Sequence, residues 1–271
     1  MSNGMNRRDA MRFAGLAAGT FFAGGSLRAF AAEKAEAGEF WKYAVVDPQK
    51  VADTAYENYK VGRCMYTTFY GIVYNVGLVL EKTDPIAAAP ILHFPFYMMK
   101  YGTGGANDWG TLCGSLNGAM AAISLFVPDS NKRKALCDEI ANYYEQTMFP
   151  IYKPANDDFG PMPQSISGSL LCHVSSGKWS SLAQKRTDSP ERTERCTRMS
   201  ADVARKTAEL LNLNAAPGIA ADAAPIVTLK RQEPGATCYS CHGKGQKNSD
   251  VIAKMSCNDC HDQAVDHSSK K

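Results

Sequence analysis

Apolar residues recur at helical spacing through most of the first 214 residues, and helix-boundary signals bracket the runs. Asp47-Pro48 places a capping residue before proline at the first helical position, which predicts a helix to about Val61. Gly62 separates it from residues 63–80, which are apolar on nearly all sides and predict a buried helix. Further helices are expected over residues 109–127, 129–148 and 189–211, so the chain is predicted to be mainly α.

Proline and glycine interrupt these helices. We expect a loop around Pro85, Pro90 and Pro95, and irregular chain over residues 150–163. The Gly-rich run at residues 102–105 resembles a dinucleotide-binding loop only weakly, because it lacks the full spacing and a preceding strand. No β-hairpin signal is convincing.

The composition changes after Asn214. Residues 215–237 are rich in Ala and Pro, and the remaining tail is polar with almost no bulky apolar side chains. Such a segment cannot bury enough surface to fold alone, so it needs another source of core. We therefore expect a helical N-terminal domain, residues 40–214, followed by a small irregular segment, residues 215–271.

Residues 1–31 have the pattern of an export signal. Arg7-Arg8 precede an apolar and small-residue run over residues 14–25, and Ala29-Phe30-Ala31 has small residues where a signal is cleaved. This pattern predicts a twin-arginine signal peptide and a periplasmic location. The alternative is an amphipathic N-terminal helix, against which the glycines of the run argue.

Removal of that signal changes the charge of the protein. The whole chain has a net charge of +3, and the signal contains four arginines and one aspartate, so 26 basic and 26 acidic side chains remain. A neutral chain implies no basic face for nucleic acid. No later apolar stretch reaches the roughly 20 residues that a membrane span needs.

Two motifs near the C-terminus have the form C-x-x-C-H, the attachment signature of haem c. They are Cys238-Tyr-Ser-Cys241-His242 and Cys257-Asn-Asp-Cys260-His261. The two thiols of each motif can add to one porphyrin, and His242 and His261 then supply the proximal nitrogens. A zinc ribbon also pairs two C-x-x-C units at this separation, but it does not require a histidine after each. We predict two covalent haems, whose apolar discs provide the missing core of the tail.

Three other histidines are candidates for the sixth ligand of the haem irons: His93, His173 and His267. Histidine on both faces gives saturated, low-potential irons suited to electron transfer, whereas methionine raises the potential. Each histidine has an alternative role: His93 as a hydrogen-bonded core or loop residue, His173 as support for the neighbouring Cys172, and His267 as part of a disordered tail. Weaker candidates are Met98, Met99 and Met255.

Five cysteines lie outside the haem motifs: Cys64, Cys113, Cys137, Cys172 and Cys196. Disulfides are the ordinary expectation in an exported chain, but an odd number leaves one thiol unpaired. Cys64, Cys113 and Cys196 fall in separate predicted helices, and Cys172 closes the irregular region. Gly114 and Gly118, which follow Cys113, would admit a bulky inorganic group or a neighbouring helix. Four thiolates converging from separate elements suit an iron–sulfur or zinc centre.

These cysteines carry a resemblance to a small redox-active family with the pattern C, C-G-A-x-x-G, C, C, from about Tyr59 to Asn212. Ser115 stands where the family has Ala. With the export signal and paired haem motifs, the whole chain resembles the split-Soret cytochromes c of sulfate-reducing bacteria. That resemblance implies a periplasmic homodimer with two haems per subunit. It also implies an iron–sulfur centre, with the 2Fe-2S type favoured, surrounded by Cys64, Cys113, Cys172 and Cys196. Cys137 lies outside the pattern and is expected to be a buried apolar thiol.

Three functions agree with these features. An electron carrier needs two saturated haems near the cluster and periplasmic redox partners. A haem-based reductase of a small oxyanion or peroxide needs a vacant iron position and a proton donor. In a redox sensor or assembly module the five thiols would do the switching, and the haems would have no direct part in it. The spare histidines, and no recognisable acid–base constellation around them, favour a non-enzymatic carrier. Because the tail has too little apolar surface to enclose two porphyrins, we expect dimerisation through the haem region.

Overall fold

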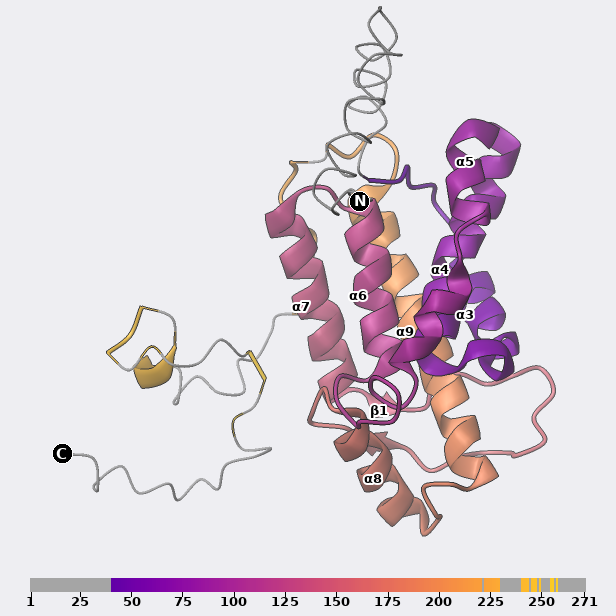
Figure 1. Ribbon diagram of the computed structural model, residues 1–271, viewed down its shortest axis with the longest axis vertical. Coiled ribbons are helices and arrows are strands. Elements are labelled where there is room, and N and C mark those ends of the chain that lie inside the picture. Colours follow the sequence, from indigo (N-terminus) through magenta and orange to yellow (C-terminus); the bar gives the residue numbers. More distant parts are fainter. Residues whose placement is uncertain are drawn as a thin grey trace, which may run out of the picture. The chain divides into compact units, whose positions relative to one another are not determined.

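The computed structural model describes residues 40–220, 222–229, 240–243, 245–247, 249, 254–255 and 257 (Figure 1). The chain divides into two compact units, residues 1–41 and 42–271, and all elements described below belong to the second. The expected signal peptide, residues 1–31, lies outside the described residues. So do four residues of the expected haem chemistry: Cys238, Cys260, His261 and His267.

The structure is mainly helical, as predicted. Figure 1 labels the α-helices and β1. In chain order the elements are α3 (Pro48–Glu57), α4 (Tyr59–Thr83), α5 (Pro85–Leu92), the 3-10 helix η1 (Phe96–Gly102), α6 (Gly114–Phe126), α7 (Ser130–Gln146), β1 (Met148–Phe149), β2 (Ser165–Ile166), α8 (Cys172–Ala183) and α9 (Pro190–Ala215). The two short strands pair antiparallel, with Met148 opposite Ile166. Within the described part of the chain, no helix is long and apolar enough to cross a membrane.

Helix α4 is the centre of the helical packing. It contacts α3, α5, α6, α9 and η1, and its side chains Phe69, Ile72 and Val76 are at most 1% exposed. The segment is apolar on nearly all sides because the helix is buried, as the sequence predicted. Near its start the helix is interrupted at Arg63, whose φ of 66° is left-handed. That interruption lies one residue after the break predicted at Gly62.

Capping side chains begin the helices that the sequence predicted best. The Asp47, Asp129 and Ser189 side chains accept backbone hydrogen bonds at the starts of α3, α7 and α9. Each satisfies a backbone N–H that has no partner inside its helix. Helix α3 then packs along α9, so residues far apart in the sequence form one layer.

The prediction of a loop around Pro85, Pro90 and Pro95 was wrong in large part, because that segment forms α5 and η1. Asp84 accepts a hydrogen bond from the Ala87 backbone, and Pro85 occupies the first turn. This is the same Asp-Pro start that begins α3, and proline is tolerated there because its missing N–H has no helical partner. Helix α8 was not predicted either, and α6 begins five residues later than the predicted start at Trp109.

The chain after α9 continues to contact the helices. The Asn214 side chain exchanges hydrogen bonds with the backbone of Ile226. Glu139 of α7 is 1% exposed and accepts a hydrogen bond from the Thr228 backbone. Because these contacts satisfy buried polar groups, residues 216–229 support the helical part of the fold.

Helices α4 and α6 approach closely because glycines line the contact. A Cβ atom on Gly118 would lie 2.6 Å from the Met65 carbonyl oxygen and 3.1 Å from the Phe69 nitrogen. The sequence left open whether Gly114 and Gly118 admit an inorganic group or a helix, and here the occupant is the α4 backbone.

We expect Gly118→Ala to lower the free energy of unfolding by about 1–3 kcal/mol, because backbone atoms cannot yield to the added methyl group. Gly177→Ala is the matched control, since a Cβ at that position of α8 meets nothing within 4 Å. It should raise the free energy of unfolding by about 0.5–1 kcal/mol. Chemical denaturation measures both, and equal effects would contradict the packing described for α6.

Candidate metal centre

Four helices each bring one cysteine towards the same region. Cys64 follows the interruption in α4, Cys113 is the residue before α6, Cys172 is the first residue of α8, and Cys196 lies in α9. Three of these thiols are buried and Cys172 is partly exposed. They are the four cysteines that the sequence predicted to converge.

Backbone hydrogen bonds hold Cys113 beside Cys172. The Cys113 N–H donates to the Leu170 carbonyl at 2.9 Å, and the Cys172 N–H donates to the Thr111 carbonyl at 2.7 Å. Leu112 and Leu171 form the bridge between these two bonds. Two helix starts that are far apart in the sequence are thereby fixed side by side.

Glycine allows Cys64 to approach Cys113. A Cβ atom on Gly114 would lie 2.4 Å from the Cys64 sulfur and 2.5 Å from the Gly102 carbonyl oxygen. Cys64 and Cys196 in turn share one buried cluster with Tyr59. The thiols therefore form one neighbourhood, which we call the four-thiol cluster: Cys64, Cys113, Cys172 and Cys196.

In the absence of a cation, burial and mutual proximity favour the protonated form of Cys64, Cys113 and Cys172. Burial raises the pKa of Cys64 to about 12, and the neighbouring Cys113 and Cys196 add to that shift. Burial also raises the pKa values of Cys113 and Cys172, and the other thiols contribute in the same direction. Deprotonation therefore requires compensating positive charge, which a bound metal ion supplies.

A buried arginine lies against this cluster, and its nearest described contacts are a thiol and a hydroxyl. Arg195 is 1% exposed, and its Nη1 lies 3.9 Å from the Cys196 sulfur. Its Nη2 donates to the Ser175 hydroxyl at 2.9 Å, whereas Nε has no partner. Among the described residues, no carboxylate forms an ion pair with it. A buried cation of this kind fits an anionic, thiolate-bound group.

The disulfide expectation is not met in the described residues, because the seven cysteines that they include are all free. Within the same residues, no three His, Cys, Asp or Glu side chains are grouped so that they could hold one metal ion in common. Cys137 lies on α7 apart from the four-thiol cluster and is partly buried. Burial, with the charge of Asp138, raises its pKa to about 11.

The structure separates the two described candidate haem ligands. His173 is exposed and follows Cys172, so it lies at the edge of the four-thiol cluster. His93 follows Leu92, which packs against Gly77 of α4. Gly77 is 13 residues beyond Cys64 in the helix, a distance of roughly 20 Å at 1.5 Å per residue.

Of the haem motifs themselves, the structure describes Cys241, His242 and Cys257. Residues 240–242 form a single helical turn, in which the Cys241 side chain is exposed. The expected attachment at the remaining cysteines and the proximal role of His261 stay predictions.

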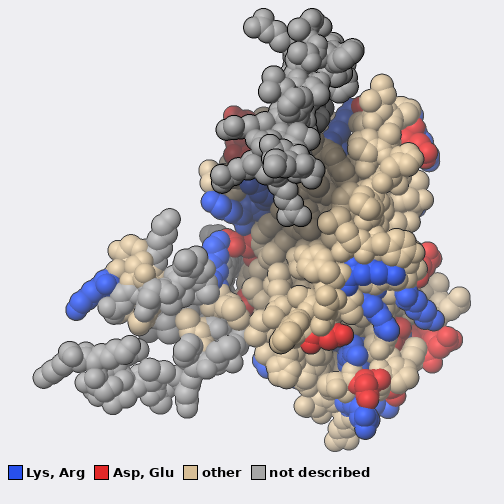
Figure 2. All heavy atoms as spheres, in the orientation of Figure 1, with Lys and Arg blue, Asp and Glu red and all other residues tan. Residues whose placement is uncertain are grey.

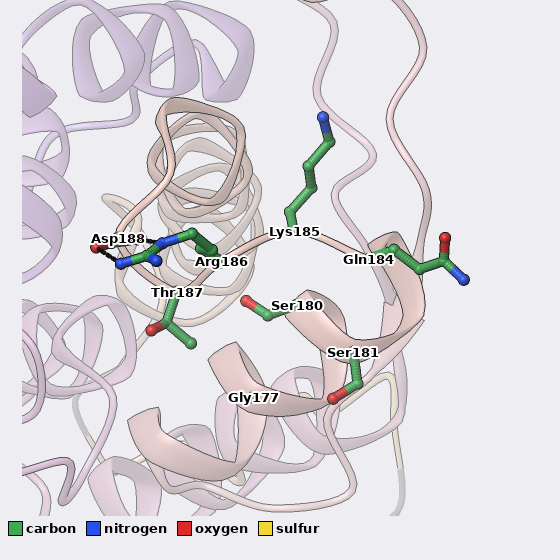
Figure 3. Close-up of a pocket in the computed structure, with 8 residues that line it drawn as sticks. All are labelled: Gly177, Ser180, Ser181, Gln184, Lys185, Arg186, Thr187 and Asp188. Carbon is green, nitrogen blue, oxygen red and sulfur yellow. Dashed lines mark hydrogen bonds and ion pairs between the residues drawn. The ribbon is translucent and has the colours of Figure 1, made fainter.

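A pocket of about 430 Å³ lies away from the thiols, between the end of α8 and the loop that leads to α9 (Figure 3). Its charged side chains are exposed, and Arg186 pairs with Asp188 across its rim. No cysteine or histidine lines it. Figure 2 shows basic and acidic side chains intermixed on this lower part of the molecule, without a surface of one sign. Nothing in this pocket supplies redox or metal chemistry.

Comparison with known proteins agrees with this geometry. Residues 93–210 match the family described as "Putative redox-active protein (C_GCAxxG_C_C)". The chain is 36% identical over 275 residues to split-Soret cytochrome c of Desulfovibrio desulfuricans, covering 95% of this chain and 94% of the relative. A solved structure of split-Soret cytochrome c from that species matches with a TM-score of 0.71 and 34% identity. The match covers 83% of this chain and 91% of that one, and the structure is described as showing a novel iron centre.

The family pattern differs from the one expected in two respects. Glycine precedes the second cysteine in the family's name, whereas this chain has Leu112 before Cys113 and Gly114 after it. The matched region also begins at residue 93, so Cys64 lies outside it and is assigned to the four-thiol cluster by its contacts alone.

Sequence reasoning missed Arg195. A signal for it was present, because Arg195 lies four residues before the apolar Met199 and therefore on the same face of α9. A charged residue on a buried stripe requires a partner, and the neighbouring Cys196 indicated where that partner lies.

Replacing any one of the four clustered cysteines by serine should remove most non-haem iron and leave the haem content unchanged. The hydroxyl is a poorer ligand for iron than a thiolate, so one substitution disrupts the whole set. Cys137→Ser is the control and should retain the iron. Iron and sulfide analysis of the purified variants measures this, and iron retained in all four would contradict the assignment.

Proposed function

Because the chain belongs to the split-Soret cytochrome c family, we propose that it is a periplasmic dihaem electron carrier of anaerobic respiration with an iron–sulfur centre. The observation that carries this proposal is that four helices bring four free cysteines into one neighbourhood, with the buried Arg195 in contact with the Cys196 sulfur. Electrons pass between the haems, this centre and periplasmic partner proteins, and the protein itself catalyses no further reaction.

The four-thiol cluster is the proposed site of the iron centre. The Desulfovibrio protein is described with a novel iron centre, and this chain has a donor set of soft ligands suited to iron. In a two-iron centre different irons take different thiolates, so the four sulfurs need not meet at one point. Such a centre supplies one-electron chemistry when bound. The thiolates hold it, and the surrounding α4 and α6 exclude water from three of them.

His93 is the first proposed haem ligand, because a backbone contact fixes the orientation of its ring. Its Nδ1 lies 2.8 Å from the Ala89 carbonyl oxygen, which fixes the ring and leaves Nε2 as the acceptor. Ligating histidines are held in this way in metal sites. Tyr97 and Met98 of η1 are 64% and 55% exposed and provide an apolar surface on the same segment. We infer that a porphyrin covers this surface and that His93 completes its iron.

His173 is the second proposed ligand. Its place beside Cys172 means that a haem ligated there lies next to the iron centre. Electron exchange between haem and centre then crosses a short distance. Ligation from either histidine across a two-fold dimer remains consistent with this proposal, and His267 is the further candidate.

The proposed carrier should contain only low-spin haem, because enough histidines exist to saturate both irons. Optical spectra of the natively exported protein should show sharp α bands on reduction and no change with carbon monoxide. Metal analysis of the same sample should give iron in excess of the haem. A high-spin fraction of about half, with carbon monoxide binding, would instead support the haem-based reductase.

We also propose that the protein is a homodimer through its haem region. Removal of residues 230–271 should give a monomer that keeps the iron centre, because residues 216–229, which satisfy buried groups of α7 and α9, are retained. Sedimentation of the truncated and full-length proteins tests this. A truncated protein that stays dimeric would place the interface on the helices.

A further inference from the structure

We propose that Arg195 and Tyr144 donate hydrogen bonds to the sulfur atoms of the iron centre and raise its reduction potential. This inference rests on the proposed function, because it requires iron in the four-thiol cluster. It adds two residues that are not ligands and that neither haem motif nor cysteine pattern includes.

The Tyr144 hydroxyl is the first of the two donors. Tyr144 lies on α7 with a side chain that is 0% exposed, and its hydroxyl has no hydrogen-bond partner among the described residues. Burial raises the pKa of Tyr144; Cys113 raises it further and Ser175 lowers it, so both side chains lie close to the hydroxyl. A buried hydroxyl left without an acceptor has a free-energy cost for folding. A sulfur carrying negative charge beside Cys113 removes that cost.

The Arg195 guanidinium is the second donor. Its Nη1 already faces the Cys196 sulfur and its Nη2 is fixed by Ser175, so Nε is the donor left over. Arg198, one turn later in α9, shows the ordinary arrangement. It is also buried, and it pairs with the carboxylates of Glu194 and Asp157. Asp202 interacts with Arg195 electrostatically but forms no ion pair with it, whereas the Cys196 sulfur lies against Nη1. The difference between these two arginines therefore points to the group held by the thiols as the anion that Arg195 contacts.

These donors favour the reduced state of the centre. Reduction adds one electron from a reduced haem to the centre, with no bond made or broken and no proton transferred. The added negative charge interacts more strongly with a fixed cation and a fixed O–H donor in a dry site. Hydrogen bonds to cluster sulfurs are among the factors that set such potentials.

The test is an electron paramagnetic resonance redox titration of the full-length, haem-loaded protein. At the potential where the wild-type centre is half reduced, Arg195→Met should lower the ratio of reduced to oxidised centre at least tenfold. That change is 59 mV for one electron. Tyr144→Phe should lower the ratio severalfold. The matched controls are Arg198→Met and Tyr143→Phe, whose parent side chains lie on the same helices outside the cluster. They should leave the ratio within twofold, although Arg198→Met lowers the melting temperature.

Unchanged potentials in iron-loaded Arg195→Met and Tyr144→Phe would overturn the inference. If Arg195→Met retains no iron, Arg195→Lys is the deciding variant for the redox titration. It keeps the charge but loses the Nε donor, so it should still lower the ratio of reduced to oxidised centre.

Full-length protein stripped of non-haem iron gives an independent readout. Without the centre, Arg195→Met should be more stable than wild type, because an unpaired buried charge is removed. A less stable variant would show a structural role and contradict the inference. A wild-type protein without non-haem iron would refute the proposed function itself.

Discussion

The close contact of α6 with α4 is the constraint on which the rest of the site depends. Because Gly114 and Gly118 have no side chains, the start of α6 lies directly against the Cys64 turn of α4. The start of α6 also carries Cys113, whose backbone bond to Leu170 fixes the segment that begins α8. One helix contact thus brings three of the four thiols together, and α9 adds the fourth.

The charge balance of this site explains why the fold and its metal belong together. Burial raises the pKa values of Cys64, Cys113 and Cys172, and no carboxylate of the described residues forms an ion pair with the buried Arg195. Each cost is removed when thiolates bind iron. Insertion of the centre before export would agree with the twin-arginine signal predicted for residues 1–31, because that route carries folded proteins, and with haem attachment to the tail in the proposed periplasmic location.

The success of the sequence predictions follows the local strength of each signal. Capping residues and apolar periodicity located α3, α7 and α9, because helix starts depend on a few neighbouring groups. The sequence did not predict α5 or α8, for different reasons. The prolines of α5 are typical of loops, whereas α8 has neither a side-chain cap nor a clear apolar stripe. The four thiols could be predicted from their number and placement. The sequence places Arg195 on the buried face of α9, but its contacts with the Cys196 sulfur and the Ser175 hydroxyl are set by the tertiary packing.

The central claim is that the four-thiol cluster binds iron separately from the haems. Mössbauer spectroscopy of the full-length protein, produced with iron isotope enrichment and exported natively, tests it most directly. The account predicts two populations, one of low-spin haem iron and one of tetrahedral iron with sulfur ligands. A spectrum that contains haem iron alone, in protein whose Cys64, Cys113, Cys172 and Cys196 are all reactive thiols or disulfides, would contradict it.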